Sequence, residues 1–342
     1  MTRYIKKLLI GTSVAASMSA IATTPAFAVN LTRPTNIQFT TNDVANTSAN
    51  KPNINTWTYA PGTPVYDNTG IGGVKRRVLN DYSNYGDTNK AIAALTDNDS
   101  ATNVELFTSG ETVTNHVGFT ANLGNKTIKI ESVTKADWAD GKLATGWLTG
   151  FRNAYSGLLS SSTLGGSNLL TLFDANFTSL VGYLSTNGFN SAGDPNIGDV
   201  TYNQQTGDLK IDLVGHLDLS GQYLNPATSS RNSTGNQILD MMLAKISQTA
   251  VLQKKPLQIS EIAKVTFNNE VNYAFSFAAI DSGAIAGDRN KTIDKTSHTG
   301  IYSWTKSYTT ASVPEPSALL GLTVVGGLVV ARRKVAKKLT SQ

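Results

Sequence analysis

The segment DVTYNQQTGDLKIDLVGHLDL, residues 199–219, decides the fold class of this chain. Apolar residues alternate with polar ones on both sides of a turn signal at Thr206-Gly207-Asp208. Alternation with a period of two is typical of a strand with one buried face. The apolar positions are Val200 and Tyr202 before the turn and Leu209, Ile211, Leu213, Leu217 and Leu219 after it. The segment therefore predicts a β-hairpin.

The same alternation recurs elsewhere in the chain and predicts further strands. Trp57 and Tyr59 alternate with threonines, a turn signal at Gly124-Asn125 separates two other runs, and Asn268-Asn269 interrupts the last long one. The other apolar positions of these runs are Val113, Val117, Phe119, Ile128, Ile130, Val265, Phe267, Val271, Tyr273, Phe275 and Phe277. Most of the chain is therefore expected to be β-structure.

Two stretches have the spacing of helices instead, with apolar residues three or four positions apart. The first stretch contains Gly141, Gly146, Gly150 and Gly157, and each glycine costs a helix roughly 1 kcal/mol relative to alanine. This helix must therefore depend on tertiary packing. The apolar positions are Leu143, Trp147, Phe151, Tyr155 and Leu158, then Leu169, Phe173, Phe177, Leu180 and Leu184.

A third helix is predicted over residues 237–253, ahead of Pro256, with Ile238, Met242, Ile246 and Ala250 on its apolar side. Together these patterns predict a β-rich α+β fold. We expect residues 54–312 to form an antiparallel β-sandwich or barrel-like domain, with helices near residues 137–187 and 237–253. Residues 29–53 are rich in Thr and Asn and predict an extended or poorly ordered lead-in.

The N-terminal residues 1–28 have the pattern of a secretory signal peptide. Three cations precede an apolar run from Leu8 to about Ile21, and Ala26 and Ala28 supply the small residues that a signal peptidase recognises. Cleavage is expected before Val29. The apolar run is shorter than the roughly 20 residues of a spanning helix, which disfavours a permanent anchor.

The C-terminal residues 313–342 combine three features in a fixed order. Val313, Pro314, Glu315 and Pro316 cannot continue a helix, because the prolines restrict the backbone and lack an N–H donor. Residues 317–331 are apolar or small and predict a short transmembrane helix in the inner membrane. Arg332, Arg333 and Lys334 follow directly and are expected to stay cytoplasmic.

This order of motif, apolar helix and basic cluster resembles the PEP-CTERM sorting signal of Gram-negative bacteria. The resemblance implies recognition and processing by an exosortase, followed by delivery to the cell surface or an exopolysaccharide matrix. Residues 137–140 (DWAD), 194–196 (DPN) and 215–217 (GHL) are also similar to a group of cyanobacterial PEP-CTERM proteins of unassigned role. That second resemblance implies no catalytic residues.

Charge and composition exclude several kinds of site. The chain contains no cysteine, which excludes disulfides, thiol nucleophiles and cysteine-ligated metals. Its formal charge of +5 comes from the two ends: without residues 1–28 and 313–342, about 21 cations face about 23 acids. The middle of the chain therefore lacks the basic surface that a nucleic-acid partner requires.

Histidine and acidic residues offer few candidates for metal binding. His216 shares a predicted strand face with Asp212 and Asp218, at about 13 Å and about 7 Å along a straight strand. A pair without a third ligand is a weak metal site, so we interpret this face, which includes Lys210, as solvated. His116 and His298 have no acids at metal-ligand spacing and are expected to be ordinary surface or loop residues.

Asp97-Asn98-Asp99 begins like a calcium loop. However, Thr102 replaces the expected glycine and Thr108 the expected glutamate, so turn and capping roles explain these residues at least as well. The sequence contains no serine nucleophile elbow, phosphate-binding glycine loop or zincin motif. No catalytic residue, metal ligand or cofactor is therefore assigned.

Three classes of function remain after these exclusions. We expect a non-enzymatic surface or matrix protein with a structural or interaction role in the envelope or exopolysaccharide. A carbohydrate-binding or adhesive module is the first alternative, although Trp57 and Trp147 of its candidate tryptophans (Trp57, Trp138, Trp147 and Trp304) lie on predicted core faces. A secreted hydrolase is the second alternative, because glycosidase carboxylate pairs come from distant strands.

Overall fold

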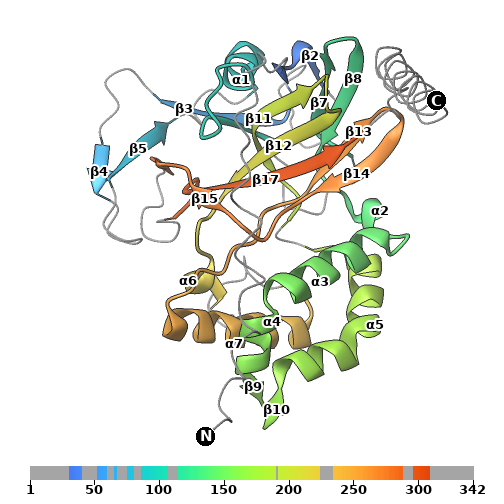
Figure 1. The fold of residues 1–342 in the computed structure, drawn as a ribbon, viewed down its shortest axis with the longest axis vertical. Coiled ribbons are helices and arrows are strands. Elements are labelled where there is room, and N and C mark those ends of the chain that lie inside the picture. The colour runs from blue at the N-terminus through green and yellow to red at the C-terminus, as the bar shows by residue number, and fades with distance from the viewer. Residues whose placement is uncertain are drawn as a thin grey trace, which may run out of the picture.

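The computed structural model describes residues 31–40, 52–59, 65–67, 75–80, 86–106, 115–189, 192–223, 234–287 and 296–308. These residues form two tiers, which Figure 1 shows one above the other. The upper tier contains the β-sheets and the short helix α1 (Thr88–Ala94). The lower tier contains the other helices and is called the helical lobe below. The predicted β-rich fold with several helices is thus confirmed.

The larger sheet has ten strands and includes the hairpin that opened the sequence analysis. Its main path, in spatial order, is β15 (Ile280–Asp281), β17 (Gly300–Ser307), β12 (Asp208–Gly215), β11 (Asn196–Asn203), β6 (Asn103–Leu106), β3 (Ile54–Tyr59), β5 (Lys75–Asn80) and β16 (Ala284–Ala286). Off this path, β1 (Leu31–Thr32) pairs with β11, and β4 (Val65–Asp67) pairs with β5.

The hairpin prediction is confirmed in its turn and in its register. Tyr202 lies opposite Leu209, Val200 lies opposite Ile211, and Gly207 in the turn has φ +76°. That left-handed backbone conformation favours glycine. Leu217 and Leu219 lie beyond the end of β12 at Gly215, so they continue the apolar pattern without continuing the strand.

The smaller sheet has five antiparallel strands. In spatial order they are β14 (Glu270–Ala274), β13 (Ala263–Phe267), β8 (Lys126–Glu131), β7 (Gly118–Leu123) and β2 (Thr35–Phe39). The predicted turns lie between these strands: Gly124 has φ +65°, and Asn268 and Asn269 have φ +52° and +61°. Phe275 and Phe277 lie beyond the end of β14.

Residues 31–40 belong to the sheets, although the sequence analysis assigns them to a lead-in. Strand β1 pairs with β11 of the larger sheet, and β2 pairs with β7 of the smaller sheet. The two short strands are extended, as expected, but they are held by backbone pairing with strands far along the chain. Their few apolar side chains gave no sign of this pairing.

One apolar core fills the space between the two sheets. Tyr202 of β11 packs edge-on against Phe267 of β13 with ring centroids 5.1 Å apart. Buried side chains from both sheets and from α1 complete this cluster, among them Ile54, Val104, Phe119, Ile130, Val200, Ile211, Val265 and Tyr302. Two sheets that share one core are packed in a sandwich-like arrangement.

The strands differ from the prediction in two respects, one in their pairing and one in their burial. Strand β16 runs parallel to β5, whereas the other described pairs are antiparallel. Strand β3 is buried on both faces, because Ile54 and Thr56 are fully buried on one side and Trp57 is 8 % exposed on the other. The expectation of a single buried face is therefore wrong for β3.

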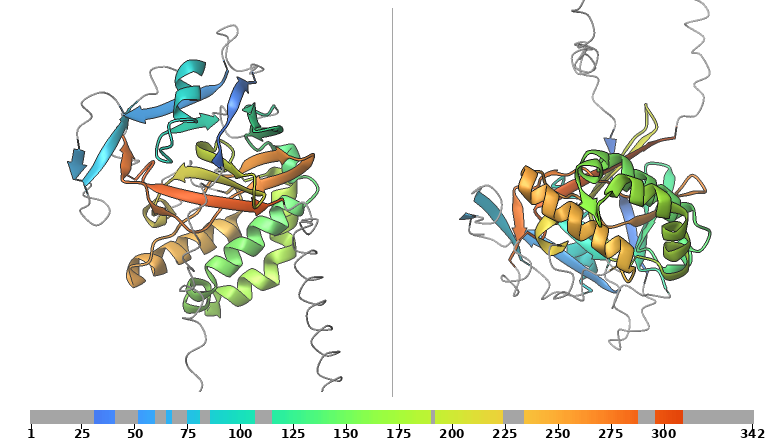
Figure 2. Two further views of the ribbon diagram at one scale, coloured as in Figure 1. Left: turned by 45° about the horizontal axis from the view of Figure 1, so that its top comes forward. Right: turned by 90° about the horizontal axis from the view of Figure 1, so that it is seen from below.

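The helical lobe contains six helices and a two-stranded ribbon. These elements are α2 (Lys135–Trp138), α3 (Lys142–Ala154), α4 (Ser156–Ser161), β9 (Thr163–Leu164), β10 (Ser167–Asn168), α5 (Leu169–Asn187), α6 (Ser220–Tyr223) and α7 (Gln237–Gln253). The right panel of Figure 2 shows α7 beside the α3–α5 helices. None of the helices in the described ranges is both long and apolar enough to cross a membrane.

The predicted helices are confirmed, with one correction to a buried face. Helix α7 has the predicted bounds, and Met242, Ile246 and Ala250 are buried as expected. Ile238 is 37 % exposed, and Leu239 and Leu243 take its place in the core. The apolar face of α7 therefore keeps three of its four predicted positions and differs from the prediction only at Ile238 and in the addition of Leu239 and Leu243.

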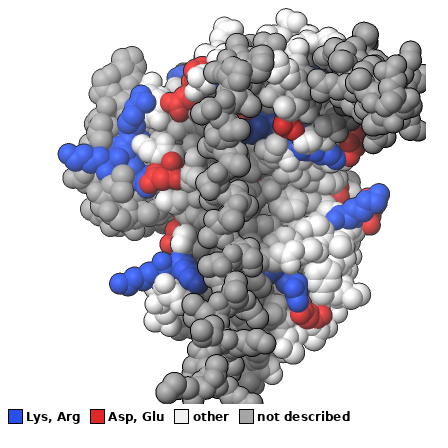
Figure 3. Space-filling view, viewed as in Figure 1, with Lys and Arg blue, Asp and Glu red and all other residues white. Residues whose placement is uncertain are grey.

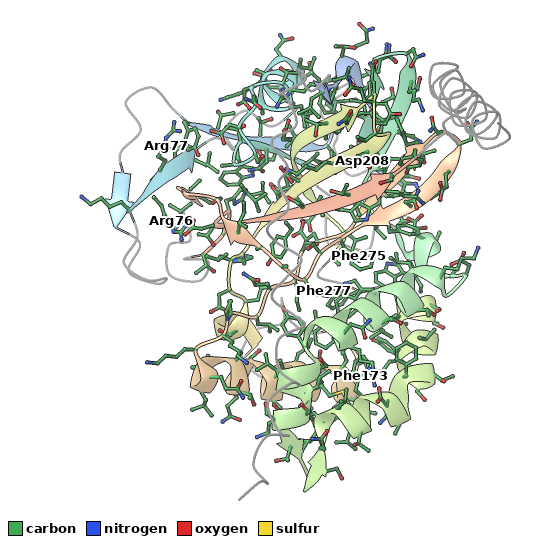
Figure 4. All side chains as sticks on the ribbon, in the orientation of Figure 1. Arg76, Arg77, Phe173, Asp208, Phe275 and Phe277 are labelled. Atoms are coloured by element: carbon green, nitrogen blue, oxygen red, sulfur yellow. The ribbon has the colours of Figure 1, made fainter. Side chains whose placement is uncertain are left out.

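A cluster of aromatic rings fixes the helical lobe to the segment that follows β14. Figure 4 shows Phe275 and Phe277 between the sheets and the helices. The Phe277 ring lies edge-on to those of Trp147 and Phe151, at centroid distances of 5.5 Å and 6.0 Å. A Cβ atom at Gly150 would stand 2.7 Å from Cε2 of Phe277, so the close approach of this ring explains the glycine.

Candidate functional site

The residues of the predicted sorting signals, Ala26, Ala28, 313–316 and 332–334, lie outside the described residues, as does the predicted transmembrane segment 317–331. The ends of the described body nevertheless lie close together. Leu31 pairs with Asn203, and the backbone N–H of Tyr308 donates to the carbonyl of Gly207 at 2.8 Å. Both ends of the body therefore lie beside the turn between β11 and β12.

His216 and Asp218 have separate partners. The His216 Nδ1 atom lies 2.9 Å from the Thr296 hydroxyl oxygen. Oδ1 of Asp218 accepts hydrogen bonds from the backbone N–H groups of Ser220 and Leu257 at 2.9 Å and 3.0 Å. Asp218 thus organises the backbone beside α6 and does not join His216 in a metal site.

The face that these residues were expected to share is only partly solvated, because the Lys210 side chain is partly exposed and Asp212 is buried. Asp212 is 1 % exposed, and its carboxylate accepts hydrogen bonds from the hydroxyls of Ser100 and Ser303 at 2.8 Å and 2.6 Å. Lys210 forms an ion pair with it at 2.8 Å. The solvated interpretation is therefore wrong at Asp212, because the segment before β6 covers this position.

Polar side chains form a row on the same face of the larger sheet. Asn55 of β3 and Asn196 of β11 each lie directly opposite Glu105 of β6. Paired residues of antiparallel strands direct their side chains to the same face. One step along the strands, Asn103 lies opposite Trp57 on this face. We call Asn55, Asn103, Glu105 and Asn196 the amide row.

Glu105 is the acidic centre of the amide row. Its Oε2 atom accepts hydrogen bonds from Nε1 of Trp57 at 3.1 Å and from Nδ2 of Asn55 at 3.3 Å. Burial of the carboxylate and the nearby charge of Asp194 raise the pKa of Glu105 to about 7, against the opposing effect of those two hydrogen bonds. Glu105 is thus an acid that exchanges its proton near neutral pH.

Several amide oxygens around Glu105 are buried without a partner. Within the described part of the chain, the Oδ1 atoms of Asn53, Asn55, Asn103 and Asn196 accept no hydrogen bond. Asn103 is fully buried and Asn196 is 9 % exposed. Buried polar atoms are rarely left without a partner, so a cluster of them marks a site that needs explanation.

His298 lies beside this row, packed against Trp57 with ring centroids 4.4 Å apart. It lies in the turn before β17, so the expectation of a loop residue is confirmed, but at 5 % exposure it is not a surface residue. Burial, with a smaller effect from the charge of His216, lowers the pKa of His298 to about 3. The ring is therefore neutral at physiological pH.

His116 belongs to a second polar cluster, where the smaller sheet meets the helical lobe. Its Nε2 atom lies 2.8 Å from Oδ2 of Asp137, and Nζ of Lys264 lies 2.8 Å from Oδ1 of the same carboxylate. Thr134 donates to Asp137 from its backbone N–H at 2.8 Å and from its hydroxyl at 2.9 Å, and the Tyr273 hydroxyl lies 3.4 Å away. His116 lies in the loop before β7, as expected, and its acidic partner comes from α2.

The Asp137 cluster is built to hold a negative charge. Burial raises the pKa of Asp137, but the hydrogen bonds from His116, Lys264 and Thr134 outweigh this effect and lower the pKa below its ordinary value. Burial and the Asp137 charge raise the pKa of Tyr273. Because the carboxylate is surrounded by donors, this cluster serves to join α2 to the smaller sheet.

The loop that resembles a calcium loop uses its acidic oxygens internally. Asp97 accepts hydrogen bonds from the Thr102 hydroxyl at 2.8 Å and from the backbone N–H of Asp99 at 2.9 Å. Asp99 accepts one from the backbone N–H of Ala101 at 2.9 Å. The turn interpretation is confirmed. Across the described ranges, no three His, Asp or Glu side chains are grouped as metal ligands.

The larger sheet also contains a buried cation. Arg76 of β5 is fully buried, and its guanidinium group forms an ion pair with the Asp281 carboxylate of β15. Figure 4 shows Arg76 beside Arg77, whose guanidinium group lies 3.3 Å from the ring centroid of Tyr59. Burial raises the pKa of Asp281, but the hydrogen bond from Arg76 outweighs it, and the net pKa is lowered. This pair fixes β15 and β16 to the sheet.

The tryptophans do not form an exposed platform. Trp57, Trp138 and Trp147 are 8 %, 2 % and 0 % exposed, which confirms the core interpretation for Trp57 and Trp147. Trp304 is half-buried and packs against the core between the sheets.

No protein-family model matches the chain, and neither does a curated protein or a solved structure.

The amide row was missed in the sequence analysis. The alternation of residues 103–106 (NVEL), with two polar and two apolar side chains on opposite faces, is the signal that predicts one polar face there.

Proposed function

We propose that this protein is exported, processed at both ends and delivered to the cell surface or an extracellular polysaccharide matrix. Signal peptidase would remove residues 1–28, and an exosortase would recognise Val313, Pro314, Glu315 and Pro316. A short helix over residues 317–331 and the cations Arg332, Arg333 and Lys334 would hold the chain in the inner membrane until that step. This proposal depends on the resemblance of residues 313–342 to the PEP-CTERM sorting signal.

The observation that carries the proposal is the order of three features within residues 313–342, together with the signal pattern of residues 1–28. The structure adds a supporting fact. The first and last described residues, Leu31 and Tyr308, lie beside the same turn of the larger sheet.

We further propose that the body has a structural or binding role and is not an enzyme. In support, the polar groups of the Asp137 cluster are bonded to one another and join parts of the fold. Figure 3 shows cations and acids interspersed among the described residues that are visible on this face. Such a surface suits a partner without high charge, such as a neutral polysaccharide, better than a nucleic acid.

Fractionation of the source bacterium tests the sorting step. The full chain and a variant with Pro314→Ala and Glu315→Ala are expressed at the same level, with Ser160→Ala as a matched control in the body. We expect the full chain and the control to reach the extracellular fraction without residues 1–28 and 317–342. The double variant should remain in the membrane fraction. Secretion of an uncleaved chain, or retention of the full chain in the cytosol, contradicts the proposal.

The alternatives each depend on a different observation. A carbohydrate-binding module would need exposed aromatic rings other than Trp57, Trp138 and Trp147, which are buried. A secreted hydrolase would use a pair of neighbouring acids, and Glu105 with Asp194 is one pair close enough to interact electrostatically. Activity on a polysaccharide that Glu105→Gln abolishes would favour the hydrolase.

A further inference from the structure

The amide row gathers oxygen acceptors from three neighbouring strands. Asn55 and Asn196 lie on either side of Glu105, and directly opposite side chains of antiparallel strands have Cβ atoms about 5 Å apart. Asn103 lies two residues from Glu105 on the same face. The two carbonyl-bearing side chains that flank Glu105 can therefore reach the space above its carboxylate.

The unsatisfied atoms of the amide row are all side-chain amide oxygens. The Oδ1 atoms of Asn55, Asn103 and Asn196 are buried acceptors without a partner, and Asn103 and Asn196 are at least nine-tenths buried. Two amide nitrogens of the row are already used, since Nδ2 of Asn55 donates to Glu105 and Nδ2 of Asn103 donates to the Ala101 carbonyl at 2.8 Å. The missing partner must therefore be a donor or a cation.

The charge around Glu105 favours a cation. Asp194 is close enough to Glu105 to act on it electrostatically, and the two acids repel each other. In the described part of the chain, no Lys, Arg or His nitrogen forms an ion pair with Glu105. The neighbouring His298 is neutral at physiological pH and does not compensate the charge of Glu105. A divalent ion would balance the Glu105 carboxylate and satisfy the amide oxygens together.

We propose that the amide row binds one divalent cation of the calcium class between β3, β6 and β11. Glu105 would supply a carboxylate oxygen, and Asn55, Asn103 and Asn196 would supply carbonyl oxygens. Calcium accepts six to eight oxygen ligands, neutral carbonyls included, in irregular geometry, whereas magnesium requires a near-ideal octahedron and retains several waters. Zinc prefers nitrogen and sulfur ligands, which are scarce here.

Titration calorimetry of the full chain tests this site independently of the proposed sorting. The chain is purified in mild detergent, stripped with EDTA and titrated with CaCl₂ and, separately, MgCl₂ at pH 8. We expect one saturable calcium site per chain, tighter for calcium than for magnesium, and a higher thermal midpoint with calcium than with EDTA. Glu105→Gln and Asn196→Ala should each weaken calcium binding by at least about tenfold.

Two control variants each replace a carboxylate outside the amide row. Asp97→Asn changes the loop that resembles a calcium loop, and Asp208→Asn changes the turn between β11 and β12. Both should bind calcium as the unaltered chain does. Circular dichroism and the thermal midpoint in EDTA establish that each variant is folded, and Asn196→Ala replaces Glu105→Gln if the latter is not.

Three results would overturn the proposal. The first is an unaltered chain that binds no calcium, which would mean that ordered water satisfies the row. The second is a folded Glu105→Gln or Asn196→Ala variant with unchanged affinity. The third is loss of binding in Asp97→Asn alone, which would place the ion in the loop.

Discussion

The helical lobe and the β-sheets bury different kinds of side chain. The core of the lobe consists of aromatic and aliphatic residues, with Phe151 in contact with four other rings. The sheets share an apolar core of their own, but the opposite face of the larger sheet buries polar groups as well. Among the described residues, the buried charged side chains Arg76, Glu131, Asp137 and Asp212 lie in the sheets or at their junction with the lobe.

This difference separates stability from chemistry. An apolar core contributes burial and packing, and offers no group that binds an ion or a proton. Buried polar groups cost free energy unless they are paired, so those that persist fix the fold or bind a ligand. The lobe therefore supports the structure, while the polar face of the larger sheet is where binding is expected. The predictions below test this contrast.

The largest effect is expected in the lobe core. Phe151 is fully buried, and its ring centroid lies 5.2–6.0 Å from those of Trp147, Tyr155, Phe173 and Phe277. Phe151→Ala should lower the free energy of unfolding by about 3–5 kcal/mol, because it leaves a cavity among these rings. Urea denaturation measures the loss. The partly buried Phe177 is the control, and an equal loss in Phe177→Ala would argue against a single dense core.

The Asp137 cluster is expected to have the next largest effect. Asp137→Asn removes the charge that Lys264 and His116 contact, and it leaves buried donors without a full partner. We expect a loss of about 1–3 kcal/mol in the free energy of unfolding at pH 7. Lys142→Ala, which removes an exposed ion pair with Asp140, should change stability little and serves as the control.

The effect of Asp137→Asn should depend on pH. Because the folded-state pKa of Asp137 is lowered, its stabilisation is present above the unfolded pKa of about 3.9 and is lost as the pH falls through the folded pKa. The difference in stability between the two chains should therefore be constant from pH 6 to 8 and shrink below about pH 4. A difference that does not shrink in acid would show that geometry, not charge, explains the loss.

The sequence predicted the elements with strong local patterns. The hairpin of residues 199–219, the turn at Asn268-Asn269 and the bounds of α7 were all readable, because each is encoded by neighbouring residues. The apolar face of α7 was misplaced only at its start, at Ile238, since the residues 237–243 (QILDMML) offer two overlapping apolar stripes. Local patterns thus fix an element's type better than its orientation.

The polar clusters were not readable, because long-range pairing creates them. Asn196 reaches Glu105 only through the pairing of β11 with β6, and Lys264 reaches Asp137 through the pairing of β13 with β8. A single sequence does not show which strands are neighbours. The contact of His116 with Asp137 was not predicted for this reason, since the two residues are 21 positions apart in the sequence.

Glu105→Gln changes the polar face of the larger sheet. It is expected to raise stability at high pH, whereas the variants of the lobe core lower stability. The folded pKa of Glu105 is raised to about 7, so in EDTA its contribution to stability is greatest at low pH and is lost as the pH rises from about 4.5 to about 7. The slope is at most about 1.4 kcal/mol per pH unit. Glu105→Gln should remove this pH dependence and make the chain more stable than the unaltered protein at pH 8.

The matched control for this titration is Asp208→Asn, whose carboxyl has a lowered pKa from the hydroxyls of Ser307 and Thr206. It should leave the slope between pH 5 and 7 unchanged. Stability curves against pH that superimpose for Glu105→Gln and the unaltered chain would contradict the assignment of Glu105 as the group that titrates there.

The smallest effect is expected at two glycines of α3, in the helical lobe. A Cβ atom at Gly146 would meet nothing within 4 Å, whereas one at Gly150 would stand 2.7 Å from Phe277. Gly146→Ala should therefore raise the free energy of unfolding by about 0.5–1 kcal/mol through helix propensity, while Gly150→Ala should lower it because the ring must move. Thermal denaturation distinguishes them. Equal gains would show that the Phe277 ring is loosely held, and the lobe would then lack the dense packing that sets it apart from the sheets.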